Sequence, residues 1–240
     1  MKKQEQEYKV NSDVELLYEI SNDCDPYKIK KLLEQGASLN PMFCGQKIEN
    51  IISHLIQSKK ATNSENFIET IKIFINQGVS LNPDGCPQPL NLAIDTGNIE
   101  LVKLLLKNGA FVNGKAGLQS PLEKALYKSD FKIIELLIEQ KAEINPKEGY
   151  STPLTIAAQS GNKQLVEFLL LKGAEVNPSI DTLSSTPLIV ACNSGNFEII
   201  KLLIKQKAEI NPTGKNLIST PLIAAVKNKN KELVELLLNN

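Results

Sequence analysis

Short amphipathic patterns alternate with polar turns along most of this chain, and residues 151–177 show the pattern most clearly. Apolar residues recur at helical spacing in each half of the segment: Leu154, Ala157, Ala158, then Leu165, Val166, Leu169 and Leu170. This spacing predicts two short helices, each with one apolar face. Isolated helices shorter than about 12–15 residues are marginal in water, so each predicted helix must pack against a neighbour.

The ends of both helices are also readable. Thr152 can cap the first helix by accepting a hydrogen bond from a free backbone amide, and Pro153 fits the first helical position. Gly161 and Gly173 suit the left-handed residue that commonly ends a helix. The segment therefore predicts a helix-turn-helix unit with defined boundaries.

The unit recurs along the chain. A Thr/Ser/Gln-Pro-Leu tripeptide has its prolines at 89, 121, 153, 187 and 221, in steps of 32, 32, 34 and 34 residues. A second marker, which ends in asparagine, keeps nearly the same period through Asn82, Asn113, Asn145, Asn177 and Asn211, and an earlier copy ends at Asn40. Each unit can bury its apolar faces only against a copy of itself, which predicts a stacked array.

The stretch TPLTIAAQSGNKQLVEFLLLKGAEVN resembles the ankyrin repeat family over nearly its whole length. The resemblance implies an all-α ankyrin-repeat solenoid of about seven stacked helix-turn-helix units with finger turns. The family's histidine after Pro-Leu is missing in every copy, which puts the hydrogen bonds between turns in doubt; Asn91, Glu123, Thr155, Ile189 and Ile223 stand there. Lys141 and Lys207 replace a helix-ending glycine, at a cost of about 1 kcal/mol each if the backbone is left-handed there.

We expect one domain over residues 1–240. Its expected parts are a degenerate N-terminal cap (1–40), an atypical longer unit (41–82), internal repeats (83–113, 114–145, 146–177 and 178–211) and a C-terminal unit (212–240). In the first unit the expected helices are 14–20, capped by Ser12 or Asp13, and a second one that begins at Asp25-Pro26 and runs to Gly36. In the second unit they are 47–57 and 66–76, with a solvated loop over 58–65. Lys227, Lys229 and Lys231 can form a polar cap on the last unit.

The amino-acid composition reduces the number of functional classes that fit the chain. Lysine plus arginine is 27 and aspartate plus glutamate is 27, so the net charge is zero and nothing draws the chain towards nucleic acid or anionic membranes. All basic residues are lysines, four cysteines form no CxxC pair, and no apolar run approaches the ~18 residues of a membrane span. We therefore predict a cytoplasmic protein. The abundance of Lys, Asn and Ile without Arg leaves open a bacterial effector that acts on a host protein in the host cell cytosol.

Catalytic chemistry has little support, and we predict a non-enzyme with no cofactor and no metal. His54 is the only histidine, and a Cys44–His54 dyad lacks a third group. A zinc site built from Cys24, Cys44, His54 and Cys86 fails on spacing. The carboxylates recur with the repeat period, which indicates a solvated face. An enzyme or metal site in residues 1–85 remains the alternative.

The resemblance implies that function lies on the finger turns and the adjoining first helices, which form a concave surface in the family. The predicted partner-binding residues are Leu118, Tyr127, Lys128, Tyr150, Gln159, Ser160, Asp181, Leu183, Asn193, Ser194, Leu217 and Lys227. Leu183 and Leu217 have the alternative of packing only finger against finger. The expected role is a protein–protein scaffold or adaptor, monomeric, with an unidentified protein partner and no nucleic acid.

Overall fold

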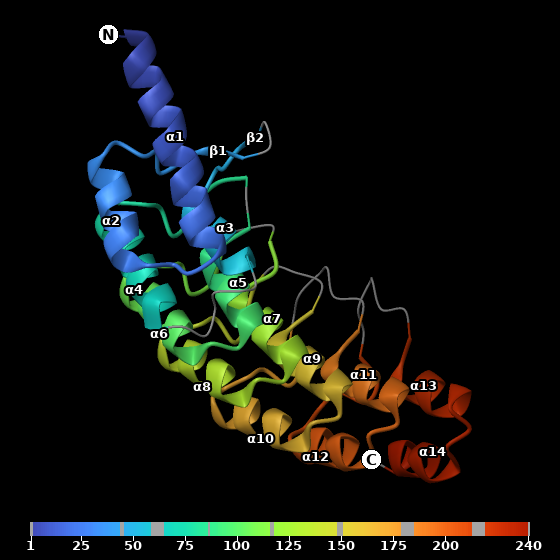
Figure 1. The fold of residues 1–240 in the computed structure, drawn as a ribbon. Helices are drawn as coiled ribbons and strands as arrows, with labels where there is room; N and C mark the ends of the chain where they lie inside the picture. Colours follow the sequence, from blue (N-terminus) through green and yellow to red (C-terminus); the bar gives the residue numbers. More distant parts are fainter. Residues whose placement is uncertain are drawn as a thin grey trace. The chain divides into compact units, whose positions relative to one another are not determined.

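The computed structural model of the protein describes residues 2–43, 46–58, 65–85, 87–115, 118–147, 151–178, 185–212 and 219–239. Within these ranges the fold is all-α apart from one two-stranded sheet, which confirms the predicted fold class (Figure 1). The helices in chain order are α1 (Lys2–Ser21), α2 (Pro26–Glu34), α3 (Ile51–Gln57), α4 (Glu65–Asn76), α5 (Pro89–Thr96), α6 (Ile99–Lys107), α7 (Pro121–Lys128), α8 (Phe131–Glu139), α9 (Pro153–Ser160), α10 (Lys163–Leu171), α11 (Pro187–Ser194), α12 (Phe197–Lys205), α13 (Pro221–Lys227) and α14 (Lys231–Leu238).

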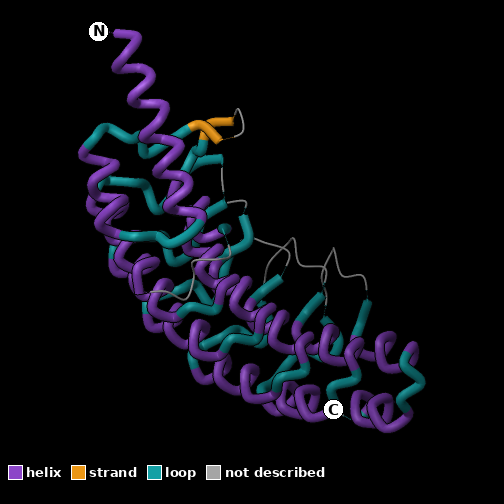
Figure 2. The backbone as a smooth tube through the Cα atoms, viewed as in Figure 1, coloured by secondary structure: helices purple, strands orange, loops and turns teal. Residues whose placement is uncertain are grey.

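The chain divides into two compact units, residues 1–121 and residues 122–240. Consecutive helices form antiparallel pairs, so each pair has a first helix and a second helix (Figure 2). In the second unit the first helices α9, α11 and α13 lie side by side, and α10 lies beside α12. In the first unit α3 packs against α5 and α2 against α4. The two helices of each pair therefore belong to two separate rows.

Side-chain caps start the helices where the sequence predicts. The hydroxyls of Thr152, Thr186 and Thr220 each accept from the backbone amide three residues later, at 3.2, 3.3 and 3.2 Å. Proline follows at the first helical position in all three helices. Asparagine takes over the cap of the second helix, as in Asn162, whose Oδ1 accepts from the amide of Leu165 at 3.1 Å. Repeated caps therefore fix the register of each helix.

Left-handed residues end the helices even where glycine is absent. Gly161 and Gly195 have φ of 74° and 69°, and Lys229 occupies the same position with φ of 54°. Lys141 and Lys207 replace the glycine after a second helix and have φ of 69° and 63°. The backbone geometry is thus kept by the stack and not by the residue type, and these lysines carry the strain that the sequence predicts.

Asparagine ties successive pairs together. Asn82 donates to the carbonyl of Gly109 at 2.9 Å, and Asn177 donates to the carbonyl of Lys207 at 2.9 Å. One hydrogen bond also comes from the position where the family has histidine, because Asn91 donates to the carbonyl of Gln119 at 3.0 Å. Asparagine side chains therefore supply some of the hydrogen bonds between turns that the missing histidines put in doubt.

The first helix differs from its prediction. The chain is helical from Lys2, so Ser12 and Asp13 lie inside α1 and do not cap a helix at Val14. The Asp13 carboxylate instead accepts from the backbone amide of Ser38 at 2.6 Å, and so ties α1 to the turn after α2. That partner lies 25 residues away, which no local pattern reveals.

The second pair also begins later than predicted. Residues 47–50 are not helical, because Met42–Phe43 and Gln46–Lys47 form a short antiparallel sheet. Asn50 then caps α3 by accepting from the amide of Ser53 at 2.9 Å. The predicted insertion over 58–65 lies mostly outside the described residues.

Candidate functional site

Exposed side chains gather at the end of each first helix in the second unit. α7, α9 and α11 each have eight residues and α13 has seven, and each begins at the repeat proline, so residues at the same distance from that proline recur at the same helical phase. We call this set the first-helix row, and its members are Tyr127, Lys128, Gln159, Ser160, Asn193, Ser194 and Lys227, all exposed. Preceding residues of the same helices, such as Ala158 and Cys192, are fully buried. Each helix thus buries one face in the stack and presents its last turn to solvent.

Tyr127 is the one aromatic residue among the members of the row. Its side chain is 59% exposed, and an aromatic ring with a hydroxyl suits an interface that is partly apolar and partly wet. Gln159 and Asn193 follow at the same position in the next two first helices. Their side-chain amides provide both a donor and an acceptor, which matches the backbone of a bound segment.

Ser160 has a structural task that its exposure conceals. Its hydroxyl donates to the carbonyl of Ala157 at 2.9 Å and accepts from the amide of Asn162 at 3.3 Å. Thr96 does the same at the end of α5, where its hydroxyl donates to the carbonyl of Ala93 at 2.7 Å. The hydroxyls of Ser160 and Thr96 therefore satisfy backbone groups at the ends of their own helices.

The finger turns are described only in part. Leu118 is 55% exposed, as a finger residue available to a partner should be. The other predicted finger residues lie outside the described residues: Tyr150, Asp181, Leu183 and Leu217. Whether Leu183 and Leu217 meet a partner or another finger thus stays a prediction.

The position in α1 that corresponds to the first-helix row was not predicted from the sequence. Cys24 is left-handed with φ of 49°, and it matches Gly161 in the repeat. Counting back from it places Asn22 at the position of Gln159, with Tyr18, 66% exposed, one turn earlier. The Pro-Leu marker is absent from α1, so only the left-handed residue gives the register.

A model of a protein family matches most of the chain. Its description is ankyrin repeats (3 copies), and the matches cover residues 59–148, 115–180 and 154–240. The chain belongs to the ankyrin-repeat family. No curated protein matches the chain. Ankyrin repeats generally mediate protein–protein interactions and are typically non-catalytic.

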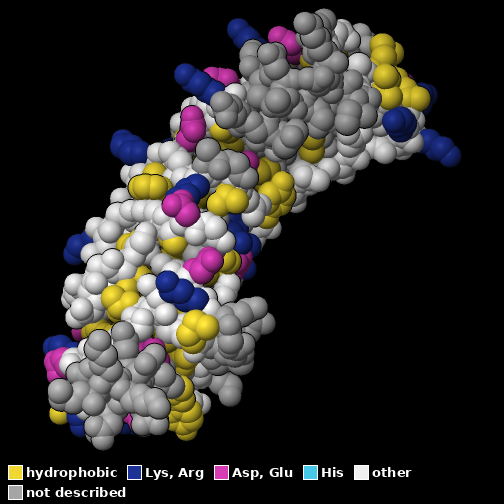
Figure 3. Space-filling model, turned by 90° about the horizontal axis from the view of Figure 1, so that it is seen from above, with side chains coloured by type: hydrophobic (Ala, Val, Ile, Leu, Met, Phe, Trp, Pro, Cys, Tyr) yellow, Lys and Arg dark blue, Asp and Glu magenta, His cyan; other side chains and the backbone are white. Residues whose placement is uncertain are grey.

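Charges on the ankyrin array are mixed. Figure 3 shows lysine side chains and acidic side chains interspersed with apolar ones on the face that it presents. Exposed ion pairs such as Lys163–Glu198, at 3.3 Å, contribute little to stability because water screens them. Asp84 accepts a hydrogen bond from Lys115, and this contact lowers the pKa of the Asp84 carboxyl. On that face the described side chains of the two signs are mixed, so neither sign of charge dominates it.

Of the residues considered for the alternative site, the structure describes His54 and Cys24, and neither is activated; Cys192, elsewhere in the chain, is buried in the same way. Burial lowers the pKa of His54, which lies half-buried on α3, so the imidazole is neutral at pH 7. Burial raises the pKa of the Cys24 thiol to about 11 and that of Cys192 to about 12, which keeps both protonated. A thiolate is the nucleophile and the metal ligand, so neither thiol suits those roles.

Other predictions from the sequence are tested only in part. Among the described residues, no three His, Cys, Asp or Glu side chains gather as metal ligands would. Cys44 and Cys86 lie outside them, and with them part of the dyad and of the zinc set. No described helix is long and apolar enough to cross a membrane.

Proposed function

We propose that the protein binds a partner protein through the first-helix row and the adjoining finger turns, in a scaffold or adaptor role. The recurrence of exposed, chemically varied residues at one position of successive first helices supports the proposal. Tyr127, Gln159, Asn193 and Lys227 occupy that position in α7, α9, α11 and α13. The position two residues earlier is a fully buried alanine in all four helices: Ala125, Ala157, Ala191 and Ala225.

The mechanism is preorganisation. Capping threonines, prolines and asparagine ties fix the backbone of the row before a partner arrives. Association then costs little ordering entropy, so modest contacts suffice for binding. The row contains no arginine and no tryptophan, so Tyr127 is its best single anchor.

The experiment is affinity capture from native lysate with the wild-type chain and with row variants, read by quantitative mass spectrometry. Tyr127→Ala/Gln159→Ala and Tyr127→Ala/Tyr150→Ala test the row and the finger. Leu171→Ala is the matched control, because Leu171 is 82% exposed on α10, outside the row.

We expect at least one protein to be retained by the wild type and by the control, and to fall about tenfold or more with the row variants. If every protein that the wild type captures is retained equally by both row variants, the row is not the binding surface. If the control loses the same proteins, binding lies elsewhere on the array.

A further inference from the structure

The asparagine that ends each copy of the second sequence marker is followed by proline in every copy except one. These prolines are Pro41, Pro83, Pro146, Pro178 and Pro212. Asn113 is followed by Gly114 instead. A proline nitrogen carries no hydrogen and cannot bond to a neighbouring side chain, whereas the backbone N–H of glycine can. Asn113 is therefore the one marker asparagine with a potential nucleophile directly after it.

The structure explains why residue 114 is a glycine. Its backbone is left-handed, with φ of 69°, a region that residues with a side chain rarely adopt. A Cβ on Gly114 would also lie 3.1 Å from Cδ of Pro121, the first residue of α7. The backbone thus favours a residue without a side chain, and such a residue leaves its nitrogen unshielded beside Asn113.

The turn that contains Asn113 controls when that nitrogen can react. The Asn113 side chain is exposed, so water reaches it. The N–H of Gly114 donates to the carbonyl of Phe111 at 2.9 Å, which closes a four-residue turn. The nitrogen can attack Asn113 only when this turn opens. One backbone hydrogen bond contributes little net stability, so we expect the open form to be populated at about a tenth.

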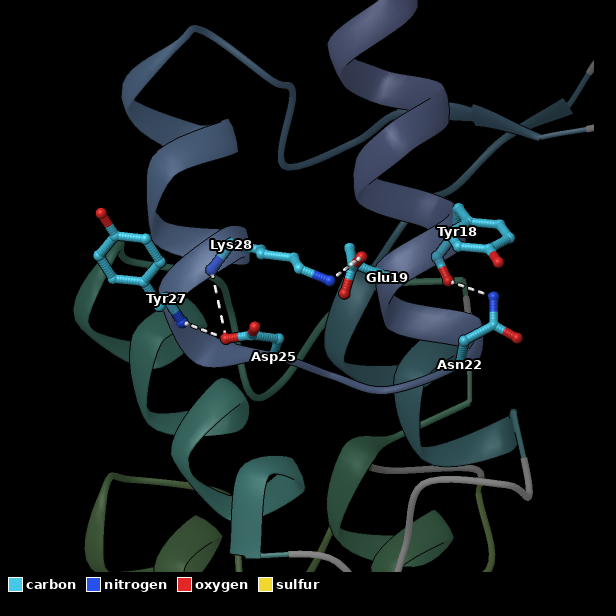
Figure 4. A network of polar contacts seen from close by, with 6 residues as sticks. All are labelled: Tyr18, Glu19, Asn22, Asp25, Tyr27 and Lys28. Atoms are coloured by element: carbon cyan, nitrogen blue, oxygen red, sulfur yellow. Dashed lines mark hydrogen bonds and ion pairs between the residues drawn. The ribbon is translucent and has the colours of Figure 1, made fainter.

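A second Asn-Gly sequence, Asn108-Gly109, lies at the end of α6 and provides an internal comparison. The side-chain amide of Asn108 donates to the carbonyl of Leu104 at 2.8 Å. Asn22 makes the same bond at the end of α1, where it donates to the carbonyl of Tyr18 at 2.8 Å (Figure 4). In both places the amide satisfies a carbonyl that the helix end leaves without an intrahelical partner.

The backbone after Asn108 is also more firmly held than the turn at Asn113. The N–H of Gly109 donates to the carbonyl of Leu106 at 3.1 Å, and the next residue, Ala110, is buried. Attack on Asn108 requires its own side-chain bond to break and the end of a packed helix to unwind. Packed helices open far more rarely than surface turns, so the fold should protect Asn108 more than Asn113.

We propose that Asn113 is a site of spontaneous covalent modification, which converts it to aspartate and isoaspartate. In the first step the nitrogen of Gly114 bonds to Cγ of Asn113, and the side-chain nitrogen leaves as ammonia with the proton that Gly114 loses. Water then opens the resulting cyclic imide. Attack of water at Cγ gives aspartate, and attack at the backbone carbonyl carbon gives isoaspartate. In sum, an amide and water become a carboxylate and ammonium.

The modification changes the base of one finger turn. Both products carry a new negative charge at residue 113, two residues from Lys115, whose ammonium pairs with Asp84. In isoaspartate the backbone runs through Cβ and Cγ and is one atom longer. Modified chains therefore differ from unmodified ones in the charge and course of the finger that carries Leu118.

The test is incubation of the 240-residue chain in mildly alkaline buffer, once folded and once in guanidinium chloride, followed by trypsin digestion and tandem mass spectrometry. Trypsin cleaves after lysine, so Lys107 and Lys115 bound a single peptide that contains both Asn-Gly sequences. Each conversion adds about 1 Da, and fragment ions assign it to Asn108 or Asn113. A chain digested without incubation gives the background.

In guanidinium chloride Asn108 and Asn113 should convert at rates within about threefold of each other, because the denatured chain holds neither. In the folded chain Asn113 should convert at least about tenfold faster than Asn108. Asn82, Asn145 and Asn177 should stay unchanged in both conditions, because proline follows each of them.

Two matched variants assign the product. Asn113→Gln should remove it from the folded chain, because glutamine would have to form a larger, more slowly closing ring. Asn108→Gln is the control and should leave it unchanged, with circular dichroism showing that both variants fold. The proposal is overturned if Asn113 in the folded wild type is still unmodified after about ten half-lives of the denatured reaction. Equal conversion of Asn108 and Asn113 in the folded chain would overturn it as well.

Discussion

The side-chain amide of Asn145 donates to the carbonyl oxygen of Gly173, 28 residues further along the chain, at 2.8 Å. Its Oδ1 also accepts from the backbone amide of Glu175 at 2.9 Å. One side chain therefore holds both a carbonyl and an amide of the next helix pair. Asn177 repeats this arrangement one step later with Lys207 and Glu209. The ladder fixes the spacing between pairs.

Asn145→Ala should lower the free energy of unfolding by about 1–2 kcal/mol, because it removes both hydrogen bonds between pairs. Urea denaturation followed by circular dichroism measures the change. Asn193→Ala is the control: Asn193 is exposed at the end of α11, and its removal should cost less than about 0.5 kcal/mol. Equal losses from the two variants would show that the ladder does not stabilise the stack.

Lys141→Gly and Lys207→Gly should each raise the free energy of unfolding by about 0.5–1 kcal/mol. The gain comes from relief of the left-handed backbone at φ of 69° and 63°, less the greater freedom of glycine in the unfolded chain. Gly173→Ala is the converse test. No atom lies within 4 Å of the added Cβ, so its cost of about 1 kcal/mol reports the backbone alone. If neither lysine variant is more stable than the wild type, the left-handed backbone at Lys141 and Lys207 is not strained.

Comparing Gly161 with Gly195 separates a steric contact with Asn196 from the effect of the left-handed backbone. Both are left-handed, with φ of 74° and 69°, but only Gly161 has a close neighbour. A Cβ there would lie 3.2 Å from Oδ1 of Asn196, whereas nothing lies within 4 Å of a Cβ at Gly195. Gly161→Ala should therefore destabilise the chain more than Gly195→Ala, in the same denaturation assay. Asn196→Ala should remove most of the difference, and a difference that survives it would refute the contact.

Most of the fold could be predicted from the sequence, because each marker of the repeat determines the structure of the residues next to it. Thr152, Pro153 and Gly161 define a helix within ten residues, and the five copies of the Pro-Leu marker predict the stack. The first two pairs lack the Pro-Leu marker, so the extent of α1, the sheet before α3 and the place of Tyr18 were missed. Their structure depends on contacts far apart in the chain, such as the one from Asp13 to Ser38.

The sequence predicts where the candidate site lies, but it does not predict what the site binds. Helical phase places Tyr127, Gln159 and Asn193 on the exposed turn, and the structure has them exposed. The same phase could not show that the hydroxyl of Ser160 is used by its own helix.

His54 should make the free energy of unfolding depend on pH near and below pH 6.5. Burial lowers its pKa in the folded chain below the ordinary value of 6.5, so the unfolded chain binds the proton more tightly. Stability therefore has its full value above pH 6.5 and falls as the pH drops through the unfolded pKa towards the folded one. Urea denaturation between pH 8 and about 5.5, above the range where carboxylates titrate, measures the slope.

The chain contains only one histidine, so His54→Gln removes the group that titrates there. The variant should show a flat dependence of unfolding free energy on pH between 7 and about 5.5, while the wild type loses stability over the same range. Comparing slopes within each protein cancels any change that the substitution makes to packing in α3. A variant with the wild-type slope, or a wild type that gains stability on acidification, would show that burial of His54 does not set this dependence.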